Sequence, residues 1–231
     1  MSVTPTTVVR FTGTERALHW GFAFLYLALV ASGLPLMFPE LRGWIRGYTS
    51  VIGFRLHLVC GVTWVLVTLA VILLGDRRAL HRTWRQLVTF GSADAAWLRR
   101  FPRWLFAGAA ERARLDGAVG RFNGGQKVNA LFTIVTSVLL LVSGAALLPV
   151  NGATLAGALT GTPSVGWWRH AHGWLTVLAL VPITGHVFLA LLFPPTRGSL
   201  PGMLSGHVDG DWAAVHHPRW RGESRDEDRA A

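Results

Sequence analysis

The chain has 231 residues, of which 51% are hydrophobic and only 15% charged, so its composition favours an integral membrane protein over a soluble domain. The net charge of +10 does not indicate a nucleic-acid partner, because the basic residues lie between long apolar runs rather than along one polar face. The one cysteine, Cys60, excludes a disulfide framework, a thiolate iron–sulfur site and covalent c-type haem attachment.

Four apolar segments are each long enough to cross a bilayer as a helix of roughly 20 residues. We expect spans at 17–37, 54–74, 128–148 and 168–193, each with a turn signal near its C-terminal end. The polar segment 1–14 has no cleavage site after it, so no cleaved signal peptide is expected. The sequence predicts an all-α membrane protein, a four-helix transmembrane bundle forming one domain over 1–231.

The distribution of basic residues predicts the orientation of the spans. All but four of the 22 lysines and arginines lie in the N-terminal tail, the connection between spans two and three, or the C-terminal tail; the four on the other side are Arg42, Arg46, Arg55 and Arg169. Both termini are therefore expected in the cytoplasm. Attraction to anionic lipid is a second role for the same charges.

Two cytoplasmic segments lie outside the spans. The connection 75–127 alternates tryptophans and leucines with arginines, which is typical of interfacial helices on the membrane surface. A docking site for a soluble partner is an alternative for this loop. The tail 194–231 ends in a polar stretch from 223 to 231.

Five of the nine histidines lie in or at the spans, and ionisable groups at membrane depth are functional candidates. Given the predicted orientation, His19 lies near the cytoplasmic face, and His57 and His172 lie near the outer face. His186 follows His172 by 14 residues, which places it roughly 21 Å deeper and within about 40° of the same helix face. The four residues thus form an outer pair and an inner pair.

The other histidines are expected to play lesser roles. His170 falls about 160° from His186 on the helical wheel, which favours an interfacial residue or a hydrogen-bond partner near the outer site. The remaining four are expected to be ordinary surface residues: His81, His207, His216 and His217.

Two depth-matched histidine pairs favour iron in b-type haem, with both axial positions filled for electron transfer. A single membrane histidine is more often a helix–helix hydrogen bond. Zinc normally requires three or four ligands, and no carboxylate or thiol lies at the right depth. Six glycines would let a porphyrin approach the backbone or would simply pack helices closely: Gly21, Gly33, Gly61, Gly144, Gly173 and Gly185.

With these residues in place, the chain resembles the cytochrome b (gamma) subunit of membrane-bound, quinone-linked formate dehydrogenases. The matching elements are spread over nearly the whole chain: Glu-Arg-Ala-Leu-His-Trp (15–20), Phe-Arg-Leu-His (54–57), Phe-Asn-Gly-Gly-Gln-Lys (122–127), His172 with His186, Gly-Met-Leu-Ser-Gly (202–206) and His-His-Pro-Arg-Trp (216–220). Two features depart from the family pattern: the longer cytoplasmic loop, and Pro194-Pro195-Thr196, which lengthens the connection after the fourth span.

The resemblance implies two b-type haems, the outer held by His57 and His172 and the inner by His19 and His186. It implies electron flow from an iron–sulfur subunit, itself joined to a molybdenum or tungsten catalytic subunit, to a menaquinone or ubiquinone near the cytoplasmic face. It also implies a multi-pass protein of the bacterial inner membrane.

The same resemblance maps a quinone site onto Asn123, Gly125 and Gln126, with His186 adjacent. Amide side chains can donate hydrogen bonds to quinone carbonyls, but a helix N-cap and turn before the third span is an equal alternative for this element. Arg16 and Arg169 lie near the predicted haem levels. They are candidates for pairing with haem propionates or for setting topology.

Three functions remain open at the level of sequence. The first is a dihaem electron-transfer subunit of a formate dehydrogenase, and the second is the cytochrome b of a hydrogenase or another molybdenum oxidoreductase. The third is a transporter or anchor without haem, in which the histidines only bond across helices. The chain has no molybdopterin or iron–sulfur motif, so no substrate-oxidising site of its own is expected.

Overall fold

The computed structural model describes residues 7–45, 47, 49–150, 153–160 and 165–221. Within them, four helices are long and apolar enough to cross a membrane, which confirms the predicted all-α fold with four spans. They are α1 (Gly13–Met37), α3 (Ser50–Leu74), α7 (Gly124–Ala146) and α9 (Val165–Val187), the last continued by the π-helical turn η1 (Phe188–Leu192). The predicted tail 223–231 and the topology residue Arg46 lie outside the described residues.

Each spanning helix begins three or four residues before its predicted start, and at α1 and α3 a polar cap sets the first turn. At α1, Thr12 and Glu15 cap each other: the Thr12 amide donates to the Glu15 carboxylate at 2.7 Å, and the Glu15 amide donates to Thr12 Oγ1 at 3.3 Å. At α3, the Thr49 hydroxyl accepts from the Ile52 amide. Such caps stabilise a helix by about 1 kcal/mol, yet they are invisible to a search for apolar runs.

The chain divides into two compact units. We call 1–16, 76–132 and 183–231 the loop unit, and 17–75 and 133–182 the span unit; α1, α7 and α9 contribute a part to each. The span unit also holds α2 (Pro39–Arg42), α8 (Leu155–Thr160) and the short strand pair β2 (Pro149–Val150) with β3 (Ala153–Thr154).

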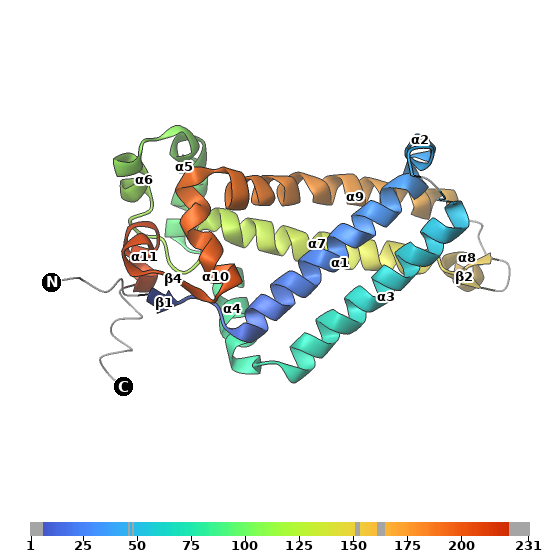
Figure 1. Cartoon of the computed structure of the whole chain (residues 1–231), viewed down its shortest axis with the longest axis horizontal. Helices are drawn as coiled ribbons and strands as arrows, with labels where there is room; N and C mark the ends of the chain where they lie inside the picture. The colour runs from blue at the N-terminus through green and yellow to red at the C-terminus, as the bar shows by residue number, and fades with distance from the viewer. Residues whose placement is uncertain (1–6, 46, 48, 151–152, 161–164, 222–231) are drawn as a thin grey trace. The chain divides into compact units, whose positions relative to one another are not determined.

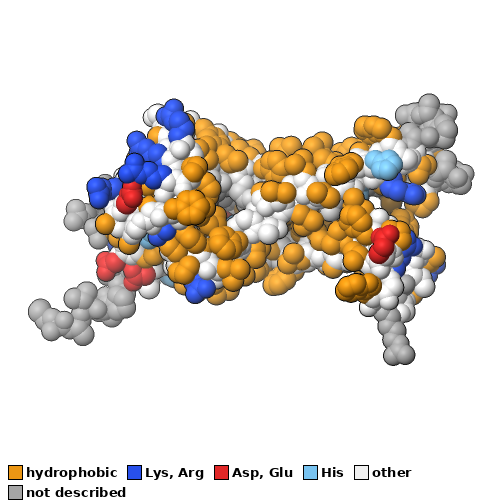
Figure 2. All heavy atoms as spheres, turned by 90° about the horizontal axis from the view of Figure 1, so that it is seen from above, with side chains coloured by type: hydrophobic (Ala, Val, Ile, Leu, Met, Phe, Trp, Pro, Cys, Tyr) orange, Lys and Arg blue, Asp and Glu red, His pale blue; other side chains and the backbone are white. Residues whose placement is uncertain are grey.

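The spanning helices expose large apolar side chains, as helices that face lipid do. On α3, Val59 and Leu66 are each 61% exposed, and Gly53 is the only buried residue of that helix. Figure 2 shows hydrophobic side chains over the surface of the long helices. A soluble protein rarely leaves so extended an apolar surface uncovered.

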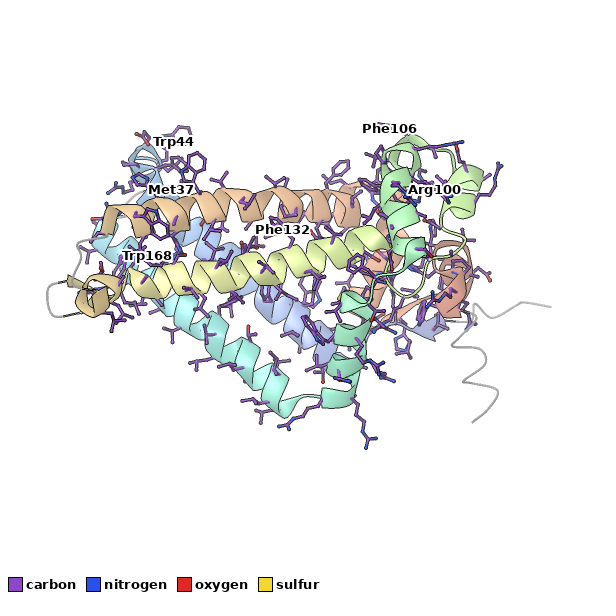
Figure 3. The ribbon with its side chains drawn as sticks, turned by 180° about the vertical axis from the view of Figure 1, so that it is seen from behind. Met37, Trp44, Arg100, Phe106, Phe132 and Trp168 are labelled. Atoms are coloured by element: carbon purple, nitrogen blue, oxygen red, sulfur yellow. The ribbon has the colours of Figure 1, made fainter. Side chains whose placement is uncertain are left out.

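The loop unit contains the three helices α4 (Arg77–Val88), α5 (Ser92–Phe106) and α6 (Ala109–Leu115), within the connection expected to form interfacial helices. Trp97, Trp104 and Val119 form its first apolar core. Phe106 ends α5 and projects outward (Figure 3), with 86% of its surface exposed.

A second core in the loop unit joins the two ends of the chain. Strand β1 (Thr7–Val9) pairs antiparallel with β4 (His207–Asp209), so that Val8 faces Val208. The turn η2 (Pro194–Ser199) and the helices α10 (Leu200–Leu204) and α11 (Gly210–His216) complete this part of the unit, and Figure 1 shows α10 and α11 beside the paired strands. Val208, Ala213 and Trp220 are its buried centre.

Candidate cofactor site

The structure brings the predicted outer pair of histidines together in the span unit. The imidazole ring centres of His57 on α3 and His172 on α9 lie 6.2 Å apart, with their planes at 88°. Two axial imidazoles on one metal have ring centres about 6 Å apart, because each metal–nitrogen bond is about 2 Å long and each ring centre lies about 1 Å beyond its nitrogen. The observed separation therefore fits a shared axial pair.

The Nδ1 atom of His57 is held by the neighbouring helix α1. It lies 3.1 Å from the Leu29 carbonyl oxygen and 3.1 Å from Ser32 Oγ. The Ser32 hydroxyl directs its own proton to the Ala28 carbonyl at 2.7 Å. Since the Leu29 oxygen can only accept, Nδ1 carries the ring hydrogen and the lone pair resides on Nε2.

The same arrangement holds His172. Its Nδ1 lies 2.9 Å from Ser143 Oγ on α7, and that hydroxyl donates to the Leu139 carbonyl at 2.8 Å. The serine proton is thus committed to the backbone, and His172 donates through Nδ1. Both histidines form hydrogen bonds across helices, but they use Nδ1 to do so. A histidine that binds a metal through Nε2 has the same Nδ1 contact, so Nε2 remains for the metal.

The donor set favours haem iron over zinc. Among the described residues, no three histidine, cysteine, aspartate or glutamate side chains are grouped so that they could hold a metal ion. Zinc sites normally use three or four protein ligands, whereas haem iron takes four bonds from its porphyrin and needs two axial ligands from the protein. The residues present fit a b-type haem.

Two of the six glycines make room for the imidazole rings. A Cβ at Gly33 would lie 2.9 Å from Cε1 of His57, and a Cβ at Gly144 would lie 3.3 Å from Cε1 of His172. Gly173 packs instead on Met37, whose side chain lies beside α9 (Figure 3), and a Cβ there would lie 3.0 Å from Met37 Cε. Gly21 packs on Val67 in the same way, so helix packing accounts for these two glycines.

The two inner histidines are on different units: His19 is on α1 in the span unit, and His186 is on α9 in the loop unit. His19 stacks edge-on against Trp20, and the His186 side chain is exposed. Their pairing stays a prediction. His170 is exposed at the start of α9, in keeping with its expected interfacial position.

The Asn123–Gln126 element caps α7. The Gln126 amide donates to Asn123 Oδ1 at 2.8 Å, and the Asn123 amide donates to Gln126 Oε1 at 3.0 Å. The N-cap interpretation is therefore correct. Both side-chain oxygens are used, and both side-chain NH2 groups stay available as donors, because no described residue accepts from them.

The glycines of the same element pack α7 against α5. A Cβ at Gly124 would lie 2.7 Å from the Asp94 carbonyl oxygen, and a Cβ at Gly125 would lie 2.7 Å from Cζ3 of Trp97. Gly125 is thus covered by an indole ring. Close packing against Trp97 accounts for a glycine at position 125. Its part in the quinone site stays a prediction.

The two candidate propionate partners differ. Arg16 donates from Nη1 to the Leu204 carbonyl at 2.8 Å, and its Nε is buried without a hydrogen-bond partner among the described residues. Arg169 is exposed and makes no hydrogen bond or ion pair with any described residue. Arg16 is therefore already partly engaged by the protein, and a propionate role for either residue stays a prediction.

The expectation that His217 is an ordinary surface residue is wrong, because it is only 4% exposed in the second core of the loop unit. Its Nδ1 donates to the Gly120 carbonyl at 2.7 Å, and its Nε2 lies 3.0 Å from Arg10 Nη2. Burial and the charge of Arg10 lower the pKa of His217 well below its usual value. Pairing of β1 with β4 creates this environment, and no local sequence pattern indicates it.

A second buried polar group was also missed. Glu15 forms an ion pair with Arg121 at 2.7 Å, and both side chains are nearly buried. Arg121 donates to the Arg10 carbonyl as well, at 3.0 Å from Nε. From the sequence, Glu15 is only part of the Glu-Arg-Ala-Leu-His-Trp element and Arg121 is only a topology charge. Together they join the first turn of α1 to the segment before α7 within the loop unit.

Residues 10–206 match the family described as prokaryotic cytochrome b561. Because the match extends over most of the 231 residues, the chain belongs to this family of membrane cytochromes. Membership implies b-type haem and a role in electron transport.

The chain is also similar to individual cytochrome subunits. It is 29% identical over 221 residues to the formate dehydrogenase, cytochrome b556(fdo) subunit of Escherichia coli (strain K12), covering 95% of this chain and 94% of that protein. It is 26% identical over 216 residues to the formate dehydrogenase, nitrate-inducible, cytochrome b556(Fdn) subunit of the same strain and of Shigella flexneri, covering 92% of this chain and 89% of those proteins. These similarities confirm the resemblance indicated by the motifs.

Proposed function

We propose that the chain is the dihaem cytochrome b subunit of a formate dehydrogenase complex. In this role it passes electrons from an iron–sulfur subunit on the outer face of the membrane to a quinone near the cytoplasmic face. The observation that carries the proposal is the His57–His172 pair, in which each Nδ1 is bonded to a neighbouring helix and each Nε2 is left for iron. The names of the relatives support the formate dehydrogenase partner.

A bound b-type haem would supply one-electron chemistry. His57 and His172 would hold the outer iron from both sides, which leaves no axial position for oxygen and suits electron transfer. The apolar surfaces of α3 and α9 would keep water from the site. His19 and His186 would hold the inner iron, and their predicted depth near the cytoplasmic face supports this role.

The quinone site is proposed at the start of α7. The side-chain NH2 groups of Asn123 and Gln126 would donate to a quinone carbonyl, because the capping box uses only their oxygens. His186 belongs to the same unit as both amides. Protons taken from the cytoplasm and electrons arriving from the outer side would together build a membrane potential.

A dithionite-reduced minus oxidised spectrum of the purified complex tests the haem proposal. The His57→Ala and His172→Ala variants should each lose the outer haem bands. The matched control is His170→Ala, two residues from His172 on the same helix and exposed; it should keep them. Absence of b-type bands from the wild-type protein would refute the proposal and favour a haem-free anchor.

The partner is tested by isolating the intact complex. Co-purification of a formate-oxidising molybdenum or tungsten subunit and an iron–sulfur subunit would support the proposed assembly. A hydrogenase or a different molybdenum oxidoreductase in the same preparation would replace the proposed partner and leave the haem assignment standing.

A further inference from the structure

The two outer histidines are supported by the same set of groups on two different helices. On α1 the support is Ser32 followed by Gly33, and on α7 it is Ser143 followed by Gly144. Each serine accepts from the Nδ1 of a histidine on the next spanning helix, 25 residues later for His57 and 29 residues later for His172. The sequence pair Ser-Gly therefore marks two equivalent positions in the span unit.

Each serine is oriented by the backbone of its own helix. Ser32 Oγ lies 2.7 Å from the carbonyl four residues earlier, and Ser143 Oγ lies 2.8 Å from the corresponding carbonyl. A hydroxyl that donates to a carbonyl at this distance presents its lone pairs outward, so the imidazole must be the donor in the second contact. Ser32 and Ser143 are 3% and 2% exposed, which shields both contacts from water.

The glycine after each serine makes this contact possible. A Cβ added at Gly33 or Gly144 would lie 2.9 Å or 3.3 Å from the Cε1 atom of its histidine, so the imidazole rings lie against bare backbone. A side chain at either position would push the ring away from the serine that precedes it. Serine and glycine therefore act together: the glycine admits the ring, and the serine accepts from its Nδ1, at His57 together with the Leu29 carbonyl.

We infer that Ser32 and Ser143 are positioning residues that set the redox potential of the outer haem, an inference that rests on the proposed axial ligation by His57 and His172. An imidazole that donates a hydrogen bond through Nδ1 becomes more basic at Nε2 and binds ferric iron more strongly than ferrous iron. Two such bonds act on one iron in the same direction. They hold the potential of the outer haem low, and loss of either bond raises it.

The test is a potentiometric titration of Ser32→Ala and Ser143→Ala in the intact complex, followed by the optical b-type bands. The outer haem is the component missing from His57→Ala. Each serine variant should shift its ferric–ferrous equilibrium about tenfold toward the ferrous state, which for one electron is a rise of about 59 mV. The Ser32→Thr and Ser143→Thr variants keep a hydroxyl and should return the potential to the wild-type value.

The matched control is Ser137→Ala. Ser137 is a buried serine six residues before Ser143 on α7, and its hydroxyl has no hydrogen-bond partner among the described residues. Its replacement should leave the potential unchanged. If a serine-to-alanine variant loses the outer haem altogether, recovery of both haem and potential in the threonine variant supports the inference, and failure to recover them overturns it.

The failure of this inference is separable from failure of the proposed ligation. An unchanged outer-haem potential in both serine-to-alanine variants, with haem content intact, would overturn the tuning role while His57 and His172 still held the iron. If His57→Ala keeps the same haem content as the wild type, the ligation itself is refuted, whatever the serine variants do.

Discussion

Replacing Gly33 with alanine should weaken haem binding at the outer site. The added Cβ would lie 2.9 Å from Cε1 of His57, whereas ordinary contacts of a Cβ begin at 3.4 Å, so the ring or the helix must move by at least 0.5 Å. The obstruction is an aromatic ring held at Nδ1 by two acceptors, not the free end of a flexible chain. The ring can move only by lengthening those hydrogen bonds.

Gly144→Ala is the matched variant on the other side of the site. Its Cβ would lie 3.3 Å from Cε1 of His172, so a shift of a few tenths of an ångström suffices. Loss of groups that orient a metal ligand typically weakens metal affinity by 10–100-fold. We expect Gly33→Ala to fall in this range, and Gly144→Ala to lower the affinity for haem less than about threefold.

The assay is titration of the haem-depleted variants with haemin, followed by the absorbance of the low-spin product. Gly33→Ala should reach half saturation at a haemin concentration at least tenfold higher than the wild type does. Equal affinities for Gly33→Ala, Gly144→Ala and the wild type would contradict the assignment of Gly33 as the space that admits His57.

Other consequences concern the loop unit. Gln126→Ala should slow quinone reduction by the complex without changing its haem content, because it removes one proposed donor; a normal rate in a quinone-reductase assay would count against the site. Arg121→Ala leaves the buried Glu15 carboxylate without its ion-pair partner and should destabilise the protein by about 3–5 kcal/mol. Arg103→Ala breaks an exposed ion pair with Glu111 and should cost less than about 1 kcal/mol. Equal melting temperatures of the two variants in detergent would refute this contrast. The pKa of His217 is lower in the folded chain than in the unfolded chain, so the unfolded state binds the extra proton and stability should fall as the pH drops below about 6.5. Opening free energies of the β1 and β4 amides, taken from hydrogen exchange after correction for the intrinsic rate at each pH, would contradict this if they stayed constant from pH 7.5 to 5.5.

The features that sequence predicts best are those set by the membrane. A span must be apolar over about 20 residues whatever its neighbours are, so four helices follow from the sequence. The juxtaposition of His57 and His172 agrees with the equal depth that the sequence predicts for them. The starts of the helices do not, because Thr12, Thr49 and Asn123 are polar caps and lie outside the apolar runs.

The features that sequence misses depend on long-range contacts. Val8 and Val208 are 200 residues apart, and nothing local indicates that they pair. The burial of His217 is a consequence of that pairing. The Ser-Gly pairs at 32–33 and 143–144 are visible as a repeated dipeptide, but only the structure places each of them against a histidine ring.

The central claim is that His57 and His172 hold the same iron. The most direct test is a pyridine haemochrome count of haem per chain in the wild type, in His57→Ala, in His172→Ala and in the double variant. We expect about two haems per wild-type chain and about one in each of the three variants, because both ligands serve one outer haem. Loss of a different haem in each single variant, with none left in the double variant, would contradict the pairing.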